Sequence, residues 1–304
     1  MNPIGTKNTE RRANHAGGVI ESVMVPNRRD VGGFDVQRAL PSAECKAVGP
    51  FVFFDQFGPL KLTQRRSLEV RPHPHIGLAT ITYLFAGTIM HRDSLGSVQP
   101  IHPGEVNWMT AGRGIVHSER TSDAGNAPEA ELFGIQTWVA LPKAKEEMEP
   151  AFAHHGRDEL PEIEGEEVWS RVILGAVFNR RSPVVTLGDP LYVDCRLELG
   201  GRVALPVSIE ERGLFVVSGR LAVDGRCLDS GTLAVFKPGK EVVVTADEPA
   251  HLILFGGPRL DGLRHVWWNF VSSSKERIEV AKRDWREGRF PTVPGEHEFT
   301  PLPE

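Results

Sequence analysis

The chain has 304 residues, with 35 basic and 40 acidic side chains and a net charge of −5. This mild charge, with its arginines in scattered pairs, excludes the basic surface that nucleic-acid binding requires. Three cysteines are too few for a disulfide framework, and no apolar run reaches the ~18–20 residues of a membrane span. We therefore expect a cytoplasmic protein with no direct nucleic-acid or membrane partner, and its length predicts two domains.

Short apolar segments separated by glycine and proline run along the chain, a pattern typical of antiparallel sandwiches and barrels. The first 15 residues are polar, and we expect them to be flexible. The predicted strands are residues 17–24, 51–54, 79–85, 134–141, 168–176, 191–199, 214–217, 232–236, 241–245 and 251–255. The charged stretch 143–167 predicts a linker, which gives one domain at 16–146 and a second at 160–304.

One helix is predicted near the C-terminus. Ser273 and Glu276 have the spacing of a capping box, and a glycine and a proline follow the predicted helix. Ile278, Ala281 and Trp285 share one face of this helix. We expect this face to cover a barrel edge; the alternative is a docking face for a partner.

The two halves of the chain resemble one another. Residues 82–89, around Gly87, match 214–221, around Gly219, and each run is followed by a Pro-Gly turn and then a histidine. A repeat of this length predicts two copies of one barrel, with chance similarity of short hairpins as the alternative. When the two glycines are superposed, the residues opposite one another are His73 and Leu205, and His75 and Val207. The second copy is therefore predicted to keep the scaffold and lack the histidines.

Four side chains at strand spacing form the strongest functional signal. His73 and His75 flank Pro74, and His117 and Glu119 lie further along the chain, again two residues apart. On a strand this spacing points both side chains to one face. Pro74 cannot donate to a ladder, so its strand is predicted at an edge or mouth. Two such strands lying together would converge three imidazoles and one carboxylate into a metal site.

This ligand set suits Fe, Mn, Ni, Cu or Zn and leaves two positions open on a six-coordinate ion. Open positions indicate chemistry, because a structural site is closed. Glu119 could instead leave the metal and take a proton as a general base. The histidines that lack a partner at ligand spacing, and are predicted not to bind the metal, are His91, His102, His154, His155, His265 and His297.

The sequence closely resembles the pirin family of bicupins over roughly residues 16–292. The segments that carry the resemblance are 72–77, 91–94, 103–104, 108–119 and 267–273 with the helix after it. The resemblance implies an all-β bicupin, with two face-to-face antiparallel jelly-roll barrels and a C-terminal helix. It also implies one divalent metal, most often iron(II), in the N-terminal cupin barrel alone. The implied ligands are His73, His75, His117 and Glu119. Such a bicupin can satisfy its own barrel edges, so we expect a monomer.

Some pirins cleave flavonols such as quercetin with O2, and others are redox-sensitive partners of transcription regulators. We expect an oxidoreductase of the quercetinase type, with a small aromatic substrate and Glu119 as the base that deprotonates the flavonol 3-hydroxyl. The dioxygenase then opens the central ring and releases carbon monoxide. The alternatives are a non-catalytic metal- or redox-sensing regulator with a protein partner, and a metal-dependent isomerase or hydrolase that needs no O2.

The sequence departs from the family pattern beside the ligands. Ile76 and Ala79 stand where most pirins carry arginine and glutamate. Loss of both charges together leaves no unpaired charge and predicts a more apolar site with altered substrate choice. The alternative is that both positions face outward and vary freely.

Overall fold

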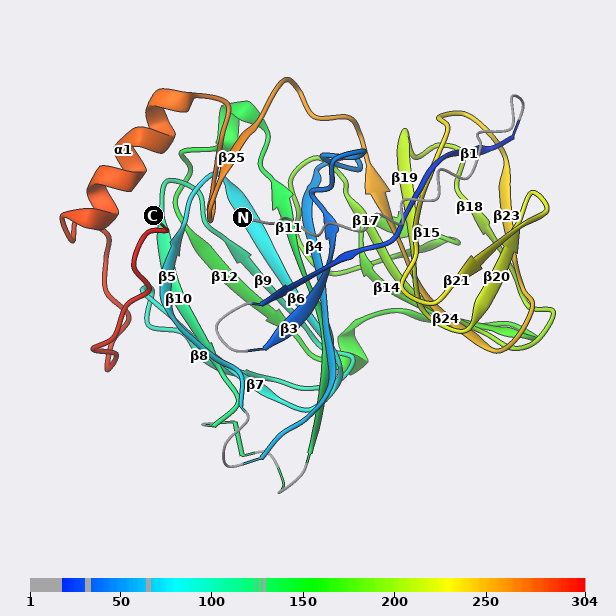
Figure 1. The fold of residues 1–304 in the computed structure, drawn as a ribbon, viewed down its shortest axis with the longest axis horizontal. Helices are drawn as coiled ribbons and strands as arrows, with labels where there is room; N and C mark the ends of the chain where they lie inside the picture. The colour runs from blue at the N-terminus through cyan, green and yellow to red at the C-terminus, as the bar shows by residue number, and fades with distance from the viewer. Residues whose placement is uncertain are drawn as a thin grey trace, which may run out of the picture.

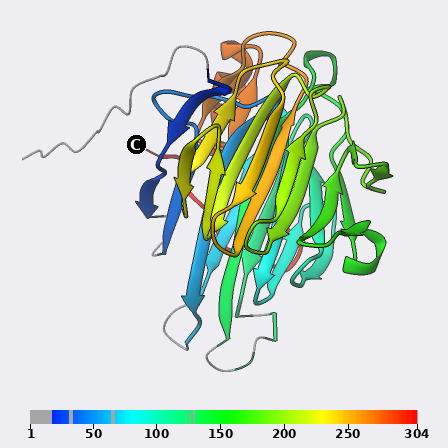
Figure 2. The ribbon, with the colours of Figure 1, turned by 90° about the vertical axis from the view of Figure 1, so that its right-hand side faces the viewer.

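The computed structural model describes residues 18–30, 34–63, 67–122, 124–125, 127 and 130–303. The predicted flexibility of residues 1–15 lies outside this part of the chain. Within it, two β-barrels stand side by side and one α-helix lies against the N-terminal barrel, as Figures 1 and 2 show. The predicted all-β architecture with a C-terminal helix is confirmed. In the described residues no helix is both long and apolar enough to cross a membrane.

The N-terminal barrel consists of two antiparallel sheets. The larger has the order β12 (Ala151–His155), β9 (Val106–Thr110), β6 (Leu78–Ala86), β11 (Glu131–Ala140), β4 (Phe51–Lys61), β3 (Asp35–Leu40) and β2 (Asn27–Asp30). The smaller has the order β5 (Glu69–His75), β10 (Ile115–Arg120), β7 (Ile89–Asp93) and β8 (Val98–Ile101). All four predicted ligands lie in the smaller sheet, on β5 and β10.

The C-terminal barrel repeats this arrangement. Its larger sheet has the order β1 (Ile20–Met24), β22 (Leu233–Phe236), β19 (Glu211–Ser218), β24 (Ala250–Gly257), β17 (Leu191–Leu197), β14 (Val168–Leu174) and β13 (Glu162–Glu164). Its smaller sheet has the order β18 (Arg202–Leu205), β23 (Val242–Ala246), β20 (Arg220–Val223) and β21 (Arg226–Asp229). Two short ribbons are separate: β15 (Ala176–Val177) with β16 (Arg180–Arg181), and β25 (His265–Trp267) with β26 (Phe270–Ser272).

The two larger sheets face one another across an aromatic core. Phe51 of β4 stacks on Tyr192 of β17, with ring centroids 5.8 Å apart, and Phe54 lies 4.9 Å from Phe215. These strands bury side chains on both faces, one toward their own barrel and one toward the other barrel. The second buried face explains why β4 and β6 read as nearly continuous apolar runs in the sequence.

The chain crosses between the barrels more often than the sequence predicted. Strand β1 pairs with β22 in the C-terminal barrel, and β26 returns to the N-terminal barrel, where Val271 N–H donates to Ile76 O at 3.1 Å. The predicted linker at 143–167 instead adds β12 to one barrel and β13 to the other. The 3-10 turn η1 (Lys143–Lys145) precedes β12, and η2 (Arg157–Glu159) lies between the two strands.

The N-cap of helix α1 (Lys275–Arg286) lies one residue after the predicted cap. Ser274, not Ser273, accepts the capping bond, from Arg277 N–H at 3.2 Å. Ser273 is engaged elsewhere, because both its N–H and its hydroxyl donate to the buried Glu146. The predicted apolar face is confirmed: Ile278 and Ala281 are buried in one cluster with Ile76 and Phe270. Figure 1 shows α1 on the outer side of the N-terminal barrel.

The internal repeat is present, and its register differs from the predicted one only after the hairpin turn. Gly87 and Gly219 both turn their hairpins with left-handed φ, 80° and 79°. Gly104 N–H then donates to the strand before the first turn, to Leu84 O, and Gly231 N–H donates to the corresponding atom of the second barrel, Val216 O. The counterpart of the first Pro-Gly turn is therefore the turn at Gly231, and that of β10 is β23.

Before the hairpin turn the predicted register holds. Met90, three residues after Gly87, pairs with Arg120, and Ala222, three residues after Gly219, pairs with Thr245. Arg120 therefore corresponds to Thr245 and His117 to Val242, and the residues opposite these last two are His73 and Leu205. Leu205 takes the place of His73, as predicted, and Val207, the predicted counterpart of His75, lies just beyond the end of β18. After the turn the second copy has shorter connections, so Val242, and not His251, takes the place of His117. The second barrel is apolar where the first has imidazoles.

Candidate metal centre

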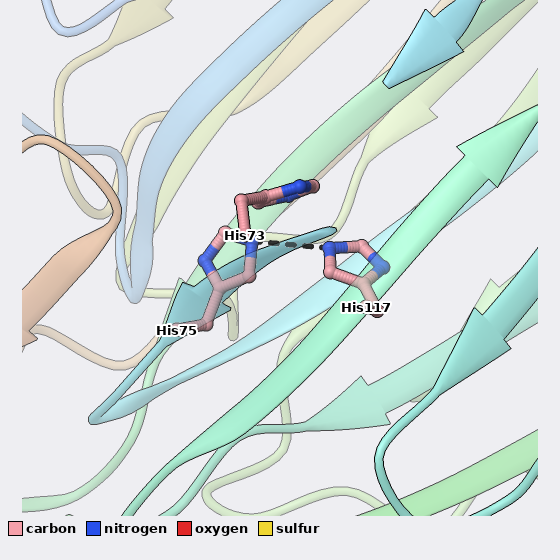
Figure 3. A group of neighbouring side chains, drawn as sticks. All are labelled: His73, His75 and His117. Carbon is pink, nitrogen blue, oxygen red and sulfur yellow. Dashed lines mark hydrogen bonds between the residues drawn. The ribbon is translucent and has the colours of Figure 1, made fainter. Parts of the chain in front are cut away.

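The three predicted histidine ligands converge. Strands β5 and β10 are antiparallel neighbours, His117 pairs directly with His73, and Ile115 pairs with His75. All three imidazoles point into the N-terminal barrel and are buried (Figure 3). The prediction that the two motifs lie on adjacent strands with their histidines on one face is confirmed.

The spacing of the imidazoles fits a metal ion. His75 Nε2 and His117 Nε2 are 3.1 Å apart, the pair that the dashed line marks in Figure 3, and the His73 ring centroid is 4.4 Å from that of His117. Two nitrogens that each bind an ion at ~2.1 Å, at right angles, are about 3.0 Å apart. The ligand atoms of all three rings lie within 4.8 Å of one another.

Backbone carbonyls fix two of the rings. Nδ1 of His73 is 2.9 Å from Arg71 O, and Nδ1 of His75 is 3.2 Å from Asn269 O. A carbonyl only accepts, so each Nδ1 carries the proton and each Nε2 presents a lone pair to the centre. Asn269 belongs to the segment between β25 and β26. Sequence reasoning missed it because the group that acts is a backbone atom far along the chain.

Burial keeps the three rings neutral. Loss of solvation lowers the pKa of His73 to about 4 and holds the pKa values of His75 and His117 well below the usual range. A metal competes with protons for the imidazole lone pair, so neutral rings at physiological pH are ready to bind. The donor set, its orientation and its charge state all fit a divalent metal.

Glu119 lies to one side of the three histidines. Its carboxylate forms a second group of ligand atoms within 4.8 Å, with His91 and His117, and among the described residues it does not join His73 and His75 at this distance. The extra residue of the irregularity between β5 and β10 lies in β5, and β10 pairs regularly with β7, where Glu119 lies opposite His91. Glu119 Oε1 accepts a hydrogen bond from Thr82 Oγ1 at 2.9 Å, and burial raises its pKa.

His91 lies against the site, which the sequence analysis missed. Its Nδ1 is 3.5 Å from His117 Nδ1, and its ring stacks on Phe152 with centroids 4.4 Å apart. The sequence signal was present: His91 and Asp93 are two residues apart on one strand, the same spacing that identified His73 and His75. This spacing also places a histidine beside a carboxylate that orients it, as His91 lies beside Asp93.

Ile76 and Ala79 are both fully buried, so the alternative that they face outward is wrong. Ile76 packs with Phe270 and with Ile278 of α1, and Ala79 lies in the core between the barrels. Each apolar side chain therefore occupies a position where an arginine or glutamate would need a buried partner.

The end of the chain crosses the outside of the ligand strands, and we call residues 291–303 the C-terminal strap. Thr300 N–H donates to Pro72 O at 2.8 Å, beside His73. Glu296 accepts from Ser118 Oγ at 2.9 Å, between the two predicted ligands of β10, and from Arg120 Nη2 at 2.7 Å. The strap therefore holds both ligand strands in place.

Replacing Glu296 by glutamine is expected to lower the free energy of unfolding by about 1.5–3 kcal/mol, because charged hydrogen bonds to Arg120 are lost in a mostly buried position. Glu298→Gln is the matched control: it makes the same change opposite the same arginine, but Glu298 is exposed. We expect it to cost under about 1 kcal/mol. Urea denaturation measures the free energy of unfolding of both variants. Equal losses in Glu296→Gln and Glu298→Gln would show that the strap contributes no buried contact.

Comparison with known proteins agrees with this geometry. A family model described as Pirin matches residues 33–139, and one described as the pirin C-terminal cupin domain matches residues 192–291. A pirin-like protein of Caulobacter vibrioides is 47% identical over 290 residues, which cover 94% of this chain and 100% of the relative.

Two solved structures extend the comparison. A quercetin 2,3-dioxygenase from Acinetobacter baumannii is 32% identical, with a TM-score of 0.86, and the match covers 93% of this chain and 95% of that one. A bacterial pirin from Escherichia coli in complex with nickel(II) has a TM-score of 0.61 at 17% identity, over 79% of this chain and 100% of that one. The latter is similar in fold.

Proposed function

Because the chain belongs to the pirin family, we propose that it is a metal-dependent dioxygenase that cleaves flavonols such as quercetin with O2. The observation that carries this proposal is the convergence of three buried, neutral imidazoles in the N-terminal barrel. The similarity to a chain named quercetin 2,3-dioxygenase, at 32% identity over nearly the whole length, supports the choice of substrate class.

His73, His75 and His117 would hold one divalent metal, with iron(II) as the first candidate and manganese, nickel, copper or zinc as alternatives. Glu119 would complete the set or act as a base. When bound, the metal orients the substrate and stabilises the negative charge of its deprotonated hydroxyl. The C-terminal barrel, with Leu205, Val207 and Val242 in the corresponding places, would hold none.

Glu119 would receive the proton of the flavonol 3-hydroxyl. Its raised pKa makes the carboxylate a stronger base than an exposed glutamate, and the Thr82 hydroxyl holds Oε1 in one orientation. His73 and Glu119 are each 8% exposed, whereas His75 and His117 are 1% exposed, so substrate would approach from the side of His73 and Glu119. Both atoms of O2 enter the opened product, and the carbon that carried the hydroxyl leaves as carbon monoxide.

The test is aerobic incubation of the iron-loaded protein with quercetin, followed by the flavonol absorbance. We expect bleaching with the parent protein and a rate at background with His75→Ala, which removes one ligand. His155→Ala is the matched control, since this histidine lies on β12 and pairs with Glu159. It should bleach the flavonol at the parent rate.

Absence of bleaching with iron, manganese, nickel, copper and zinc would refute the dioxygenase proposal. Turnover without oxygen consumption would favour the isomerase or hydrolase alternative. Metal-dependent binding to a protein partner, without turnover, would favour the regulatory alternative.

A further inference from the structure

We propose that His91 and Asp93 are positioning residues for His117. They form a chain of hydrogen bonds from the Asp93 carboxylate, through the His91 imidazole, to Nδ1 of His117. The chain leaves the lone pair of His117 Nε2 directed at the metal site. This inference rests on the proposed metal site but not on the reaction.

The first link is a carboxylate that can only accept. Asp93 is fully buried, and its Oδ1 accepts the N–H groups of Leu95 and Ser97 at 2.9 and 3.0 Å. Its Oδ2 is 3.1 Å from His91 Nε2. Because an ionised carboxylate has no proton to give, His91 donates from Nε2.

The second link is the remaining nitrogen of His91. A neutral imidazole has one N–H and one lone pair, so a proton on Nε2 makes Nδ1 the acceptor. The ring is held flat against Phe152, and its Nδ1 faces His117 Nδ1 at 3.5 Å, the long end of the hydrogen-bond range. His117 then carries its proton on Nδ1, and its Nε2 faces His75 Nε2.

The position of His117 in the sheet explains why it needs an imidazole partner. His73 and His75 use backbone carbonyls, which are available because β5 is an edge strand and Asn269 lies in a loop. Strand β10 instead lies between β5 and β7 and uses its backbone groups in two ladders. A side chain on β7 therefore supplies the acceptor.

The hydrogen bonds from Asp93 through His91 to His117 exclude a competing arrangement in which His91 itself binds the metal. The ligand atoms of His91, His117 and Glu119 also lie within 4.8 Å of one another, so His91 is itself a candidate ligand. Asp93 occupies Nε2 of His91, and Nδ1 has a single lone pair. That lone pair can accept from His117 or bind a metal, but not both.

The substitution Asp93→Asn tests the direction in which the hydrogen bonds between Asp93, His91 and His117 are donated. The asparagine oxygen would still accept hydrogen bonds from the N–H groups of Leu95 and Ser97, so the NH2 group of the asparagine would face His91 Nε2. His91 would then have to accept there and donate from Nδ1. His117 would accept at Nδ1 and carry its proton on Nε2, where the metal must bind.

We expect Asp93→Asn to bind nickel(II) ~10–100-fold more weakly than the parent in competition with a chelator. In histidine-labelled, metal-free protein, 15N NMR should place the His117 proton on Nδ1 in the parent and on Nε2 in the variant. Asp194→Asn is the matched control. This substitution also replaces a buried carboxylate that faces a histidine, His251. Because Asp194 lies in the C-terminal barrel, the affinity for nickel(II) should not change.

Unchanged nickel affinity in a folded Asp93→Asn variant would overturn the inference. So would a parent in which the His117 proton lies on Nε2 or His91 carries two protons. The parent NMR spectrum needs no variant, which keeps the inference testable if Asp93→Asn does not fold. If the parent binds no nickel(II), the proposed metal site fails, and the position of the His117 proton still decides the positioning chain.

Discussion

Replacing Arg264 by methionine is expected to lower the free energy of unfolding by about 3–5 kcal/mol, the cost of leaving a buried charge without its partner. Arg264 Nε lies 2.7 Å from Glu146 Oε1, in an ion pair whose side chains are 1% and 6% exposed. The N–H of Nε does not point along this contact, so the pair is electrostatic, while Nη2 donates to Leu141 O at 3.0 Å. Methionine fills similar space but leaves the Glu146 carboxylate uncompensated.

The same substitution is expected to weaken metal binding. Glu146 accepts hydrogen bonds from Ser272 and Ser273, which end the segment that brings Asn269 O to His75. Arg259→Met is the control, because Arg259 forms a solvent-exposed ion pair with Glu211 whose loss should leave the free energy of unfolding nearly unchanged. Urea denaturation and chelator competition measure the two effects. A loss of stability in Arg264→Met without weaker metal binding would separate this ion pair from the site.

Acidification of the metal-free protein is the second large effect. His73 has a pKa of about 4 in the folded protein against 6.5 for an ordinary histidine, so between these values the unfolded chain takes up a proton that the folded protein refuses. Stability is therefore complete above pH 6.5 and falls as the pH drops toward 4, by about 3 kcal/mol for His73 alone. The lowered pKa values of His75 and His117 act in the same direction.

Urea denaturation in the presence of a chelator, at several pH values between 7 and 4, measures this dependence. His73→Gln should flatten it, whereas His155→Gln should not. The raised pKa of Glu119 acts oppositely, because the folded protein holds that proton more tightly than the unfolded chain. A free energy of unfolding that stays constant between pH 6.5 and 5 in the parent would contradict the assignment of neutral, buried histidines.

The sequence determined the parts of the site that depend on local spacing. A period of two along a strand places His73 and His75 on one face, and Pro74 and the left-handed glycines mark where strands end and hairpins turn. The same local rules predicted the barrel strands and the buried face of α1. The register of the repeat was predicted correctly before the hairpin turn and wrongly after it, because the later strands have connections of different length, which spacing alone does not reveal.

Only the tertiary structure decided what surrounds the histidines. Asn269 O, Glu296 and Thr300 reach the ligand strands from the far end of the chain, through backbone atoms or single charged contacts that leave no periodic signal. Thr82 of β6 donates to the Glu119 carboxylate, and strand pairing brought His91 to Glu119 and His117. Side-chain alternation is a property of each strand and can be read from sequence. Strand pairing and the return of the C-terminal segment depend instead on contacts between residues that are far apart in the chain.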